Sequence, residues 1–345
     1  MNEATISHAR CAALRGVAAI AVYFHHSNGI SAPLGMSAGY RAVDLFFILS
    51  GFVIAHAYEE KLRRDLTPLQ LTLLRIARIY PLYLVGLIIG AGGAFLAVLL
   101  HGGDLSMHVV VVSTVAMLFL LPSPATNAFM PLNVPAWSLF FELLANAIYA
   151  QLAKVLNNRR LILLIGAAAA ILTWLSVRAG TTNMGVEWSG FVGGVMRVLF
   201  SFFAGILLYR VRPRRILHTP WAWILPLIAL PSLYLASEEL IPDLLCVFVV
   251  FPTMIWLGSA VELPTRRVAN FLGDTSYGLY VIHVPMILLS YKTFSYFGSD
   301  ANRFAPWTGL ILLAALLPGI YILDRIYDQP VRSWVAAKVR SRFRG

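Results

Sequence analysis

Long apolar runs without a charged residue constrain this chain more than any other feature. The clearest run extends from Leu161 to Val177. A helix needs about 20 apolar residues to cross the hydrocarbon core of a bilayer, and only helices satisfy their backbone polar groups within one segment there. Of the 345 residues, 59% are hydrophobic and 12% are charged, whereas soluble domains carry about 25% charged residues. The sequence predicts an all-α integral membrane protein and excludes a soluble domain.

Short basic clusters between the apolar runs indicate the orientation. Cytoplasmic loops of membrane proteins are enriched in Lys and Arg. The clusters lie at residues 61–64, 154–160, 210–215, 266–267 and 332–344. They account for the net charge of +11, so we expect membrane lipid as a partner and no nucleic acid. We predict a multi-pass protein of the cell membrane with both termini in the cytoplasm.

The same loops divide the chain into about ten transmembrane helices. Working inward from both ends gives spans near 10–28, 41–58, 136–153, 161–178, 190–209, 221–236, 244–261, 275–291 and 307–327. Residues 79–121 must cross an odd number of times, yet they contain two apolar runs. The second run, Val109 to Leu121, is short for a span and is expected to be re-entrant or interfacial. We expect one membrane domain over residues 1–345 and no cleavable signal peptide. Cys11 and Cys246 lack the spacing of metal ligands, and we expect no metal site.

Ionisable side chains at membrane depth are costly and therefore indicate function by default. Arg15 and His26 share the first span. Eleven positions at about 100° each return to within roughly 20° of the starting direction, so both side chains face the same way, while His25 points off that face. The structural alternative for such a histidine is a packed residue that bonds a carbonyl.

Three further sites pair a functional reading with a structural one. Asp44, near the start of the second span, either orients an imidazole or caps a helix. Arg75 and Arg78 form a two-guanidinium patch suited to phosphate, or they anchor the helix on the cytoplasmic side. Trp137 fits an interfacial belt, but Glu142 lies too deep for one, and Ser138 shares its face.

A polar stripe also marks the helix expected at 275–291. Ser276, Tyr280 and His283 lie within about 40–60° of one another, and Tyr277 lies to the side. Such a stripe lines a cavity or packs on another polar face. Together, these groups predict a polar cavity with basic residues on the cytoplasmic side, entered from there by an anionic cofactor.

Six short motifs in order resemble the membrane acyltransferase family 3. They are the Arg15 to His26 spacing, Asp44-Leu45-Phe46-Phe47-Ile48-Leu49-Ser50-Gly51-Phe52, Arg75-x-x-Arg78, Pro135-Ala136-Trp137-Ser138-Leu139 with Glu142, Ser276-Tyr277-Gly278-Leu279-Tyr280 with His283, and Asp328-Gln329-Pro330-Val331-Arg332. The last departs from the family, which usually has Glu before the proline region, and this weakens any role for it.

The resemblance implies an acyl-CoA-dependent O-acyltransferase that moves an acetyl group from acetyl-CoA to a hydroxyl of a carbohydrate or glycolipid acceptor. In family terms His26 is catalytic, Arg15 is its essential helix partner, and the Arg75/Arg78 pair meets CoA phosphates. We expect Asp44 or Glu142 to fix the tautomer of His26. The residues assigned to cofactor binding are Arg15, Arg75, Arg78, Ser276, Tyr277, Tyr280 and His283.

Other readings stay open at this point. A secondary transporter or a flippase for a glycolipid or sugar would also place charges inside the membrane, although no inverted repeat is visible. A non-catalytic membrane partner that binds glycolipid is a third reading. For an acyltransferase, His26 acts either as a general base or as a nucleophile that forms an acyl-histidine.

Overall fold

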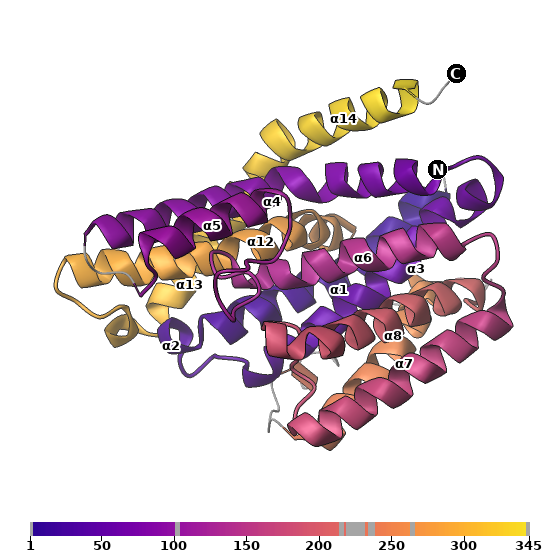
Figure 1. The fold of residues 1–345 in the computed structure, drawn as a ribbon, viewed down its shortest axis with the longest axis horizontal. Helices are drawn as coiled ribbons and strands as arrows, with labels where there is room; N and C mark the ends of the chain where they lie inside the picture. Colours follow the sequence, from indigo (N-terminus) through magenta and orange to yellow (C-terminus); the bar gives the residue numbers. More distant parts are fainter. Residues whose placement is uncertain are drawn as a thin grey trace.

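The computed structural model describes residues 3–100, 104–213, 217–218, 232–233, 239–262 and 266–342. Within these ranges the chain is almost entirely helical (Figure 1), which confirms the predicted fold class. The two short strands, β1 (Leu217–His218) and β2 (Val261–Glu262), pair in parallel.

Within the described ranges, eight long helices build the body of the protein. They are α1 (Glu3–His26), α3 (Ala42–Arg64), α4 (Pro68–Leu99), α6 (Trp137–Leu152), α7 (Asn158–Ala179), α8 (Phe191–Arg210), α12 (Arg266–Tyr296) and α13 (Trp307–Leu323). The shorter helices are α2 (Asn28–Ser31), α5 (Met107–Leu118), α10 (Leu240–Leu245), α11 (Phe251–Ala260) and α14 (Gln329–Arg342). The 3₁₀ turns are η1 (Ser37–Arg41), η2 (Val134–Ala136), η3 (Trp188–Gly190) and η6 (Ala301–Phe304), and the π-helical turns are η5 (Cys246–Val250) and η7 (Asp324–Asp328).

Local sequence signals set several helix ends. Thr67 and Gln70 form a reciprocal capping box at the start of α4, where Pro68 occupies the first turn. Asn157 caps α7, and Gly180 ends that helix in a left-handed conformation with φ of 70°. These signals fix where the long helices begin and end.

The centre of the bundle is the pairing of α1 with α12 and of α3 with α8. The second pair is very close, because Gly51 of α3 faces the backbone of α8 and Gly205 of α8 faces the backbone of α3. A Cβ atom at either position would meet a carbonyl oxygen of the other helix. Small residues allow this approach inside membranes. Helix α4 packs against both α12 and α6 and brings its arginines to the same centre.

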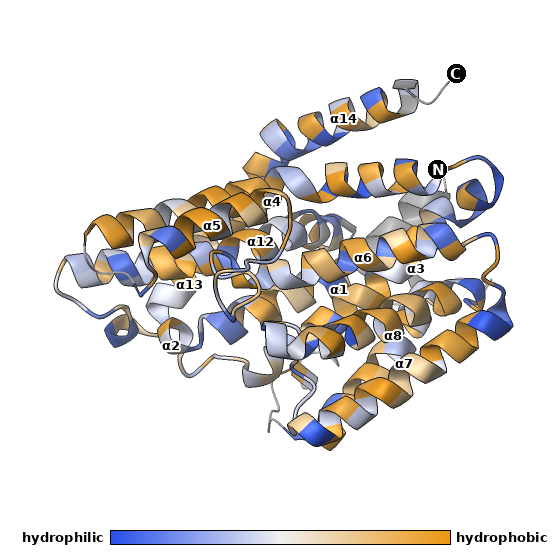
Figure 2. Ribbon diagram, viewed as in Figure 1, coloured by the Kyte–Doolittle hydropathy of each residue, from blue (hydrophilic) through white to orange (hydrophobic). Residues whose placement is uncertain are grey.

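The outer helices present a surface suited to lipid. Figure 2 shows that α4, α5, α7 and α13 are largely hydrophobic. On α7, large apolar side chains such as Ile162, Leu163, Trp174 and Val177 are exposed rather than packed inside the protein. An exposed apolar surface of this extent is typical of a membrane protein.

Six segments of the described chain are long and apolar enough to cross a membrane. They are Ser37–Arg64, Pro68–Leu99, Asn158–Ala179, Trp188–Arg210, Leu240–Ala260 and Trp307–Val339. Helices α1 and α12 carry too many polar residues to meet this criterion, and α6 has 16 residues. The expected span near 221–236 lies outside the described residues. The count of about ten is therefore not confirmed and stays a prediction.

Helix α5 occupies the segment expected to be re-entrant or interfacial. Its 12 residues correspond to about 18 Å of helix, less than the ~30 Å of a hydrocarbon core. It packs beside α4. The helix is short for a span, and its re-entrant or interfacial placement stays a prediction.

Candidate active site

A cavity of about 810 Å³ opens among α1, α3, α4, α6, α12 and the junction of α13 with α14. Seven of the predicted site residues line this single cavity: Arg15, Arg75, Arg78, Glu142, Ser276, Tyr277 and Tyr280. They come from α1, α4, α6 and α12, so helices far apart in the sequence each contribute side chains to the lining. A cavity lined by arginines is therefore present, but His26, Asp44 and His283, which the sequence also assigns to the site, do not line it.

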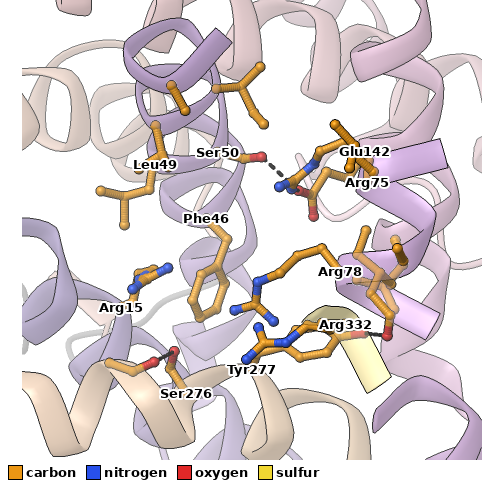
Figure 3. A pocket seen from close by; sticks show the side chains of 18 of the residues that line it. Arg15, Phe46, Leu49, Ser50, Arg75, Arg78, Glu142, Ser276, Tyr277 and Arg332 are labelled. Carbon is orange, nitrogen blue, oxygen red and sulfur yellow. Dashed lines mark hydrogen bonds and ion pairs between the residues drawn. The ribbon is translucent and has the colours of Figure 1, made fainter. Parts of the chain in front are cut away.

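Guanidinium groups lie on two opposite sides of the cavity. Figure 3 shows Arg15 on one side and Arg78 and Arg332 on the other, with the ring of Phe46 between them. The side chain of Arg78 is 38% exposed and lies over the ring of Tyr277, 5.4 Å from its centroid. This arrangement offers several donors to an anion that enters the cavity.

A buried carboxylate holds two of these arginines in place. Asp328 is fully buried, and its Oδ2 lies 3.0 Å from Nε of Arg332 and 3.8 Å from Nη1 of Arg78. Arg332 also donates to Asp324 at 3.2 Å. Both aspartates belong to the π-helical turn η7. Single π-helical turns inside α-helices are frequent at functional sites.

Arg75 and Arg78 both line the cavity, but they have different ion-pair partners. Nη2 of Arg75 lies 2.7 Å from Oε1 of Glu142, and Oγ of Ser50 donates to the same oxygen at 2.6 Å. The dashed lines in Figure 3 show this cluster. Arg75 is therefore neutralised by Glu142, whereas Arg78 shares Asp328 with Arg332 and is more exposed.

His26 lies outside the cavity lining, at the last position of α1. It lies eleven positions after Arg15, which is about 16 Å along the helix axis. Its ring centroid is 5.2 Å from that of His283 and 5.0 Å from that of His25. The ring of His25 contacts Tyr40, and its Nδ1 bonds the carbonyl of Met36 at 3.2 Å. The histidines thus form a cluster beyond the inner end of the cavity.

Tyr280 joins the cavity to this cluster. Its hydroxyl lies 2.7 Å from Oγ of Ser138, and its ring lies 5.4 Å from Phe46 and 6.3 Å from His283. Ser276, one turn earlier on the stripe, bonds the carbonyl of Gly273 in its own helix. The predicted stripe therefore runs from the cavity wall to the histidines.

Neither predicted carboxylate partner reaches His26. Glu142 bonds Arg75 and Ser50, and Asp44 forms a buried ion pair with Arg197, with 2.7 Å between Oδ2 and Nη2. The guanidinium of Arg197 also lies over the ring of Trp137, 5.2 Å from its centroid. Trp137 is 4% exposed and so is not an interfacial belt residue. The expectation that one carboxylate orients His26 does not match these contacts.

Sequence reasoning missed Arg197, Arg332, Asp324 and Asp328. Arg197 interrupts the apolar run of α8. An arginine at that depth requires a buried partner, so its position in the sequence could have indicated the ion pair with Asp44. Arg332 and Asp328 belong to the tail motif that was discounted because of its Asp-Gln pair. Their spacing of four residues on a helix was the usable signal.

Comparisons with known proteins agree with this architecture. The family model described as "Acyltransferase domain" (Acyl_transf_3) matches residues 12–325. This match covers most of the chain. The chain belongs to the acyltransferase 3 family, and it is an O-acyltransferase of the membrane.

Two curated proteins from rhizobia are similar to the chain. "Protein 2 in picA locus" of Rhizobium radiobacter is 36% identical over 172 residues, which cover 46% of this chain and 89% of that protein. "Exopolysaccharide production protein ExoZ" of Rhizobium meliloti (strain 1021) is 28% identical over 297 residues, covering 82% of this chain and 86% of that protein. No solved structure gives a significant match.

Proposed function

We propose that this enzyme transfers an acetyl group from acetyl-CoA to a hydroxyl of a polysaccharide or of its lipid-linked precursor. The observation that carries the proposal is the cavity lined by Arg15, Arg78 and Arg332, whose wall residue Tyr280 lies 6.3 Å from the ring of His283, the neighbour of His26. The similarity to a protein named for exopolysaccharide production supports the acceptor class.

The donor is assigned to the cavity on chemical grounds. CoA carries several phosphate groups at one end and the thioester at the end of a long flexible arm. Guanidinium groups bind phosphate through paired charge-assisted hydrogen bonds, and Tyr277 and Phe46 offer aromatic faces beside them. We propose that a phosphate group held by Arg78 and Arg332 places the arm in the cavity beside Tyr280, the lining residue that contacts His283.

His26 is the group we propose to act on the acceptor. The acceptor hydroxyl attacks the thioester carbon, its proton moves to a ring nitrogen of His26, and the C–O bond forms as the C–S bond breaks. The CoA thiolate then takes up the proton. A neutral imidazole is the side chain best suited to this transfer near neutral pH. An acyl-histidine route would use the same residue as nucleophile.

Replacement of His26 tests this assignment. In proteoliposomes with radiolabelled acetyl-CoA, His26→Ala should abolish transfer, because loss of a general base costs about 10²–10⁴-fold. Acetyl-CoA binding should persist, because the arginines are untouched. His25→Ala is the matched control and should be milder. Near-normal turnover of His26→Ala at equal protein level would refute the mechanism.

We also propose that both termini lie in the cytoplasm, so that the donor cavity faces the cytoplasmic pool of acetyl-CoA. Reporter fusions at Gly345 and at Asn157 should both give a cytoplasmic signal. An external signal at either position would refute this orientation and the ten-span topology together.

A further inference from the structure

His283 is a fully buried histidine whose two ring nitrogens have unequal surroundings. Its Nδ1 lies 2.8 Å from the carbonyl oxygen of Leu279. A carbonyl only accepts, so Nδ1 carries the hydrogen, and in the neutral ring Nε2 carries the lone pair. Nε2 is buried and has no hydrogen-bond partner among the residues that the structure describes.

An unpaired polar atom in the interior needs an explanation. Leaving a buried acceptor unsatisfied costs about 1–3 kcal/mol, and most buried polar atoms in proteins are satisfied. A leucine or phenylalanine would fill the same space without that cost. The lone pair at Nε2 is therefore a feature that packing alone does not explain.

The nearest titratable group on a facing helix is His26. The two ring centroids are 5.2 Å apart and the rings are tilted by 45°. At this separation a rotation of the His26 ring brings one of its nitrogens within hydrogen-bond distance, about 3 Å, of Nε2. The other groups around the pair are His25 from α1, Tyr23 from α1 and Tyr280 from α12. None of them is a carboxylate.

We infer that His283 is the positioning residue of His26, in place of the carboxylate that orients histidine in many hydrolytic triads. The inference rests on the proposed function. The hydrogen bond from Nδ1 of His283 to the carbonyl of Leu279 leaves Nε2 as the acceptor. Nε2 then accepts a hydrogen bond from an N–H of His26. The other nitrogen of His26 then presents its lone pair to the acceptor hydroxyl.

The same contact serves the transition state. When His26 takes the hydroxyl proton, its ring becomes positively charged, and both of its nitrogens donate hydrogen bonds. A neutral Nε2 accepts from this imidazolium and stabilises it without placing a buried negative charge nearby. Removal of the Nε2 acceptor should lower kcat while leaving donor binding intact.

The test compares substitutions at position 283. Gln places an amide oxygen near the position of Nε2, whereas Asn and Phe do not. His283→Phe should lower kcat by about 10²–10³-fold, within the range for loss of acid–base function, with the KM for acetyl-CoA unchanged. His283→Gln should recover at least tenfold of that loss. Tyr23→Phe, whose ring also borders His283, is the matched control and should keep its kcat.

Folding and function are separated by measurement. Thermal unfolding in detergent reports whether each variant is folded. If His283→Phe is unfolded, the test is the comparison of kcat between His283→Gln and His283→Asn. Equal kcat values for Gln and Asn, or a folded His283→Phe with kcat near that of the wild type, would overturn the inference. A wild type that transfers no acetyl group from acetyl-CoA would instead refute the proposed function and this inference with it.

Discussion

Two ion pairs of this enzyme have the same length and differ in burial. Asp44 pairs with Arg197, and Glu142 pairs with Arg75, each across two helices at 2.7 Å. The side chains of the first pair are 1% exposed, whereas those of the second are 15% and 18% exposed and line the cavity. One pair is sealed inside protein and the other borders the space assigned to the donor.

Burial decides what each pair can do. A ligand cannot replace either partner of a sealed pair. Asp44 and Arg197 therefore hold α3 against α8. The ring of Trp137 packs against the guanidinium of Arg197. A pair at a cavity wall can exchange its partner when an anion enters. We therefore expect Glu142 to act as a counter-ion that keeps Arg75 in place while the cavity is empty.

The largest effect is expected for the sealed pair. Arg197→Leu leaves the Asp44 carboxylate buried without its partner, which costs about 3–5 kcal/mol. Thermal unfolding in detergent should show a strongly destabilised or unfolded protein. Arg75→Leu is the matched control and should cost at most about 1 kcal/mol, because its partner reaches the cavity.

A double variant sharpens this result. Asp44→Leu combined with Arg197→Leu removes both charges, and buried ion pairs can be replaced by apolar residues at little cost. The double variant should be more stable than Arg197→Leu alone. If Arg197→Leu and Arg75→Leu unfold at the same temperature, burial does not distinguish the two pairs.

The sequence predicts which residues approach the cavity better than it predicts their partners. Arg15, Arg75, Arg78 and the stripe on α12 are recognisable because helical periodicity fixes which side chains share a face. Partners come from other helices, and their identity depends on the rotation and tilt of each helix in the bundle. No local pattern records that Asp44 meets Arg197, 153 positions away in the chain.

The tail motif shows the same limit. Asp328 and Arg332 lie one turn apart, and this spacing was visible in the sequence, but their position beside Arg78 follows from the packing of α14 on α4. The π-helical turn that aims Asp324 and Asp328 inward has no sequence signature of its own. Long-range packing, rather than motif chemistry, decided their role.

The second prediction concerns the cavity arginines. Arg75→Gln combined with Arg78→Gln should raise the Kd for acetyl-CoA by about 10–100-fold, since hydrogen bonds to charged groups contribute roughly 1.5–3 kcal/mol. Isothermal titration of the detergent-purified enzyme measures this, and wild-type binding should weaken more with salt than binding by the variant. Arg63→Gln, at an exposed ion pair outside the cavity, is the matched control. Unchanged binding by the double variant would leave these arginines with only an anchoring role.

A smaller effect is expected when the counter-ion of the cavity pair is removed. Glu142→Gln takes a negative charge away from the phosphate path and releases Arg75, so the Kd for acetyl-CoA should fall by about two- to fivefold, within the range of partly exposed ion pairs. Asp44→Asn should leave the Kd of the folded fraction unchanged. Weaker binding by Glu142→Gln would show that the carboxylate contacts the donor rather than restraining Arg75.

The smallest effect should come from the two hydroxyls that bond these carboxylates. Ser50 donates to Oε1 of Glu142 at 2.6 Å, and Ser201 donates to Oδ1 of Asp44 at 3.4 Å. In Ser50→Ala, Oε1 loses one donor and depends more on Arg75, so the arginine is held more firmly and the Kd for acetyl-CoA should rise about two- to threefold. This corresponds to less than the roughly 1 kcal/mol of one hydrogen bond. Ser201→Ala removes a long bond from a sealed pair, and the Kd should stay unchanged in the same titration. Equal shifts of Kd in both variants would mean that the sealed pair and the cavity pair are coupled, and the distinction drawn between them would fail.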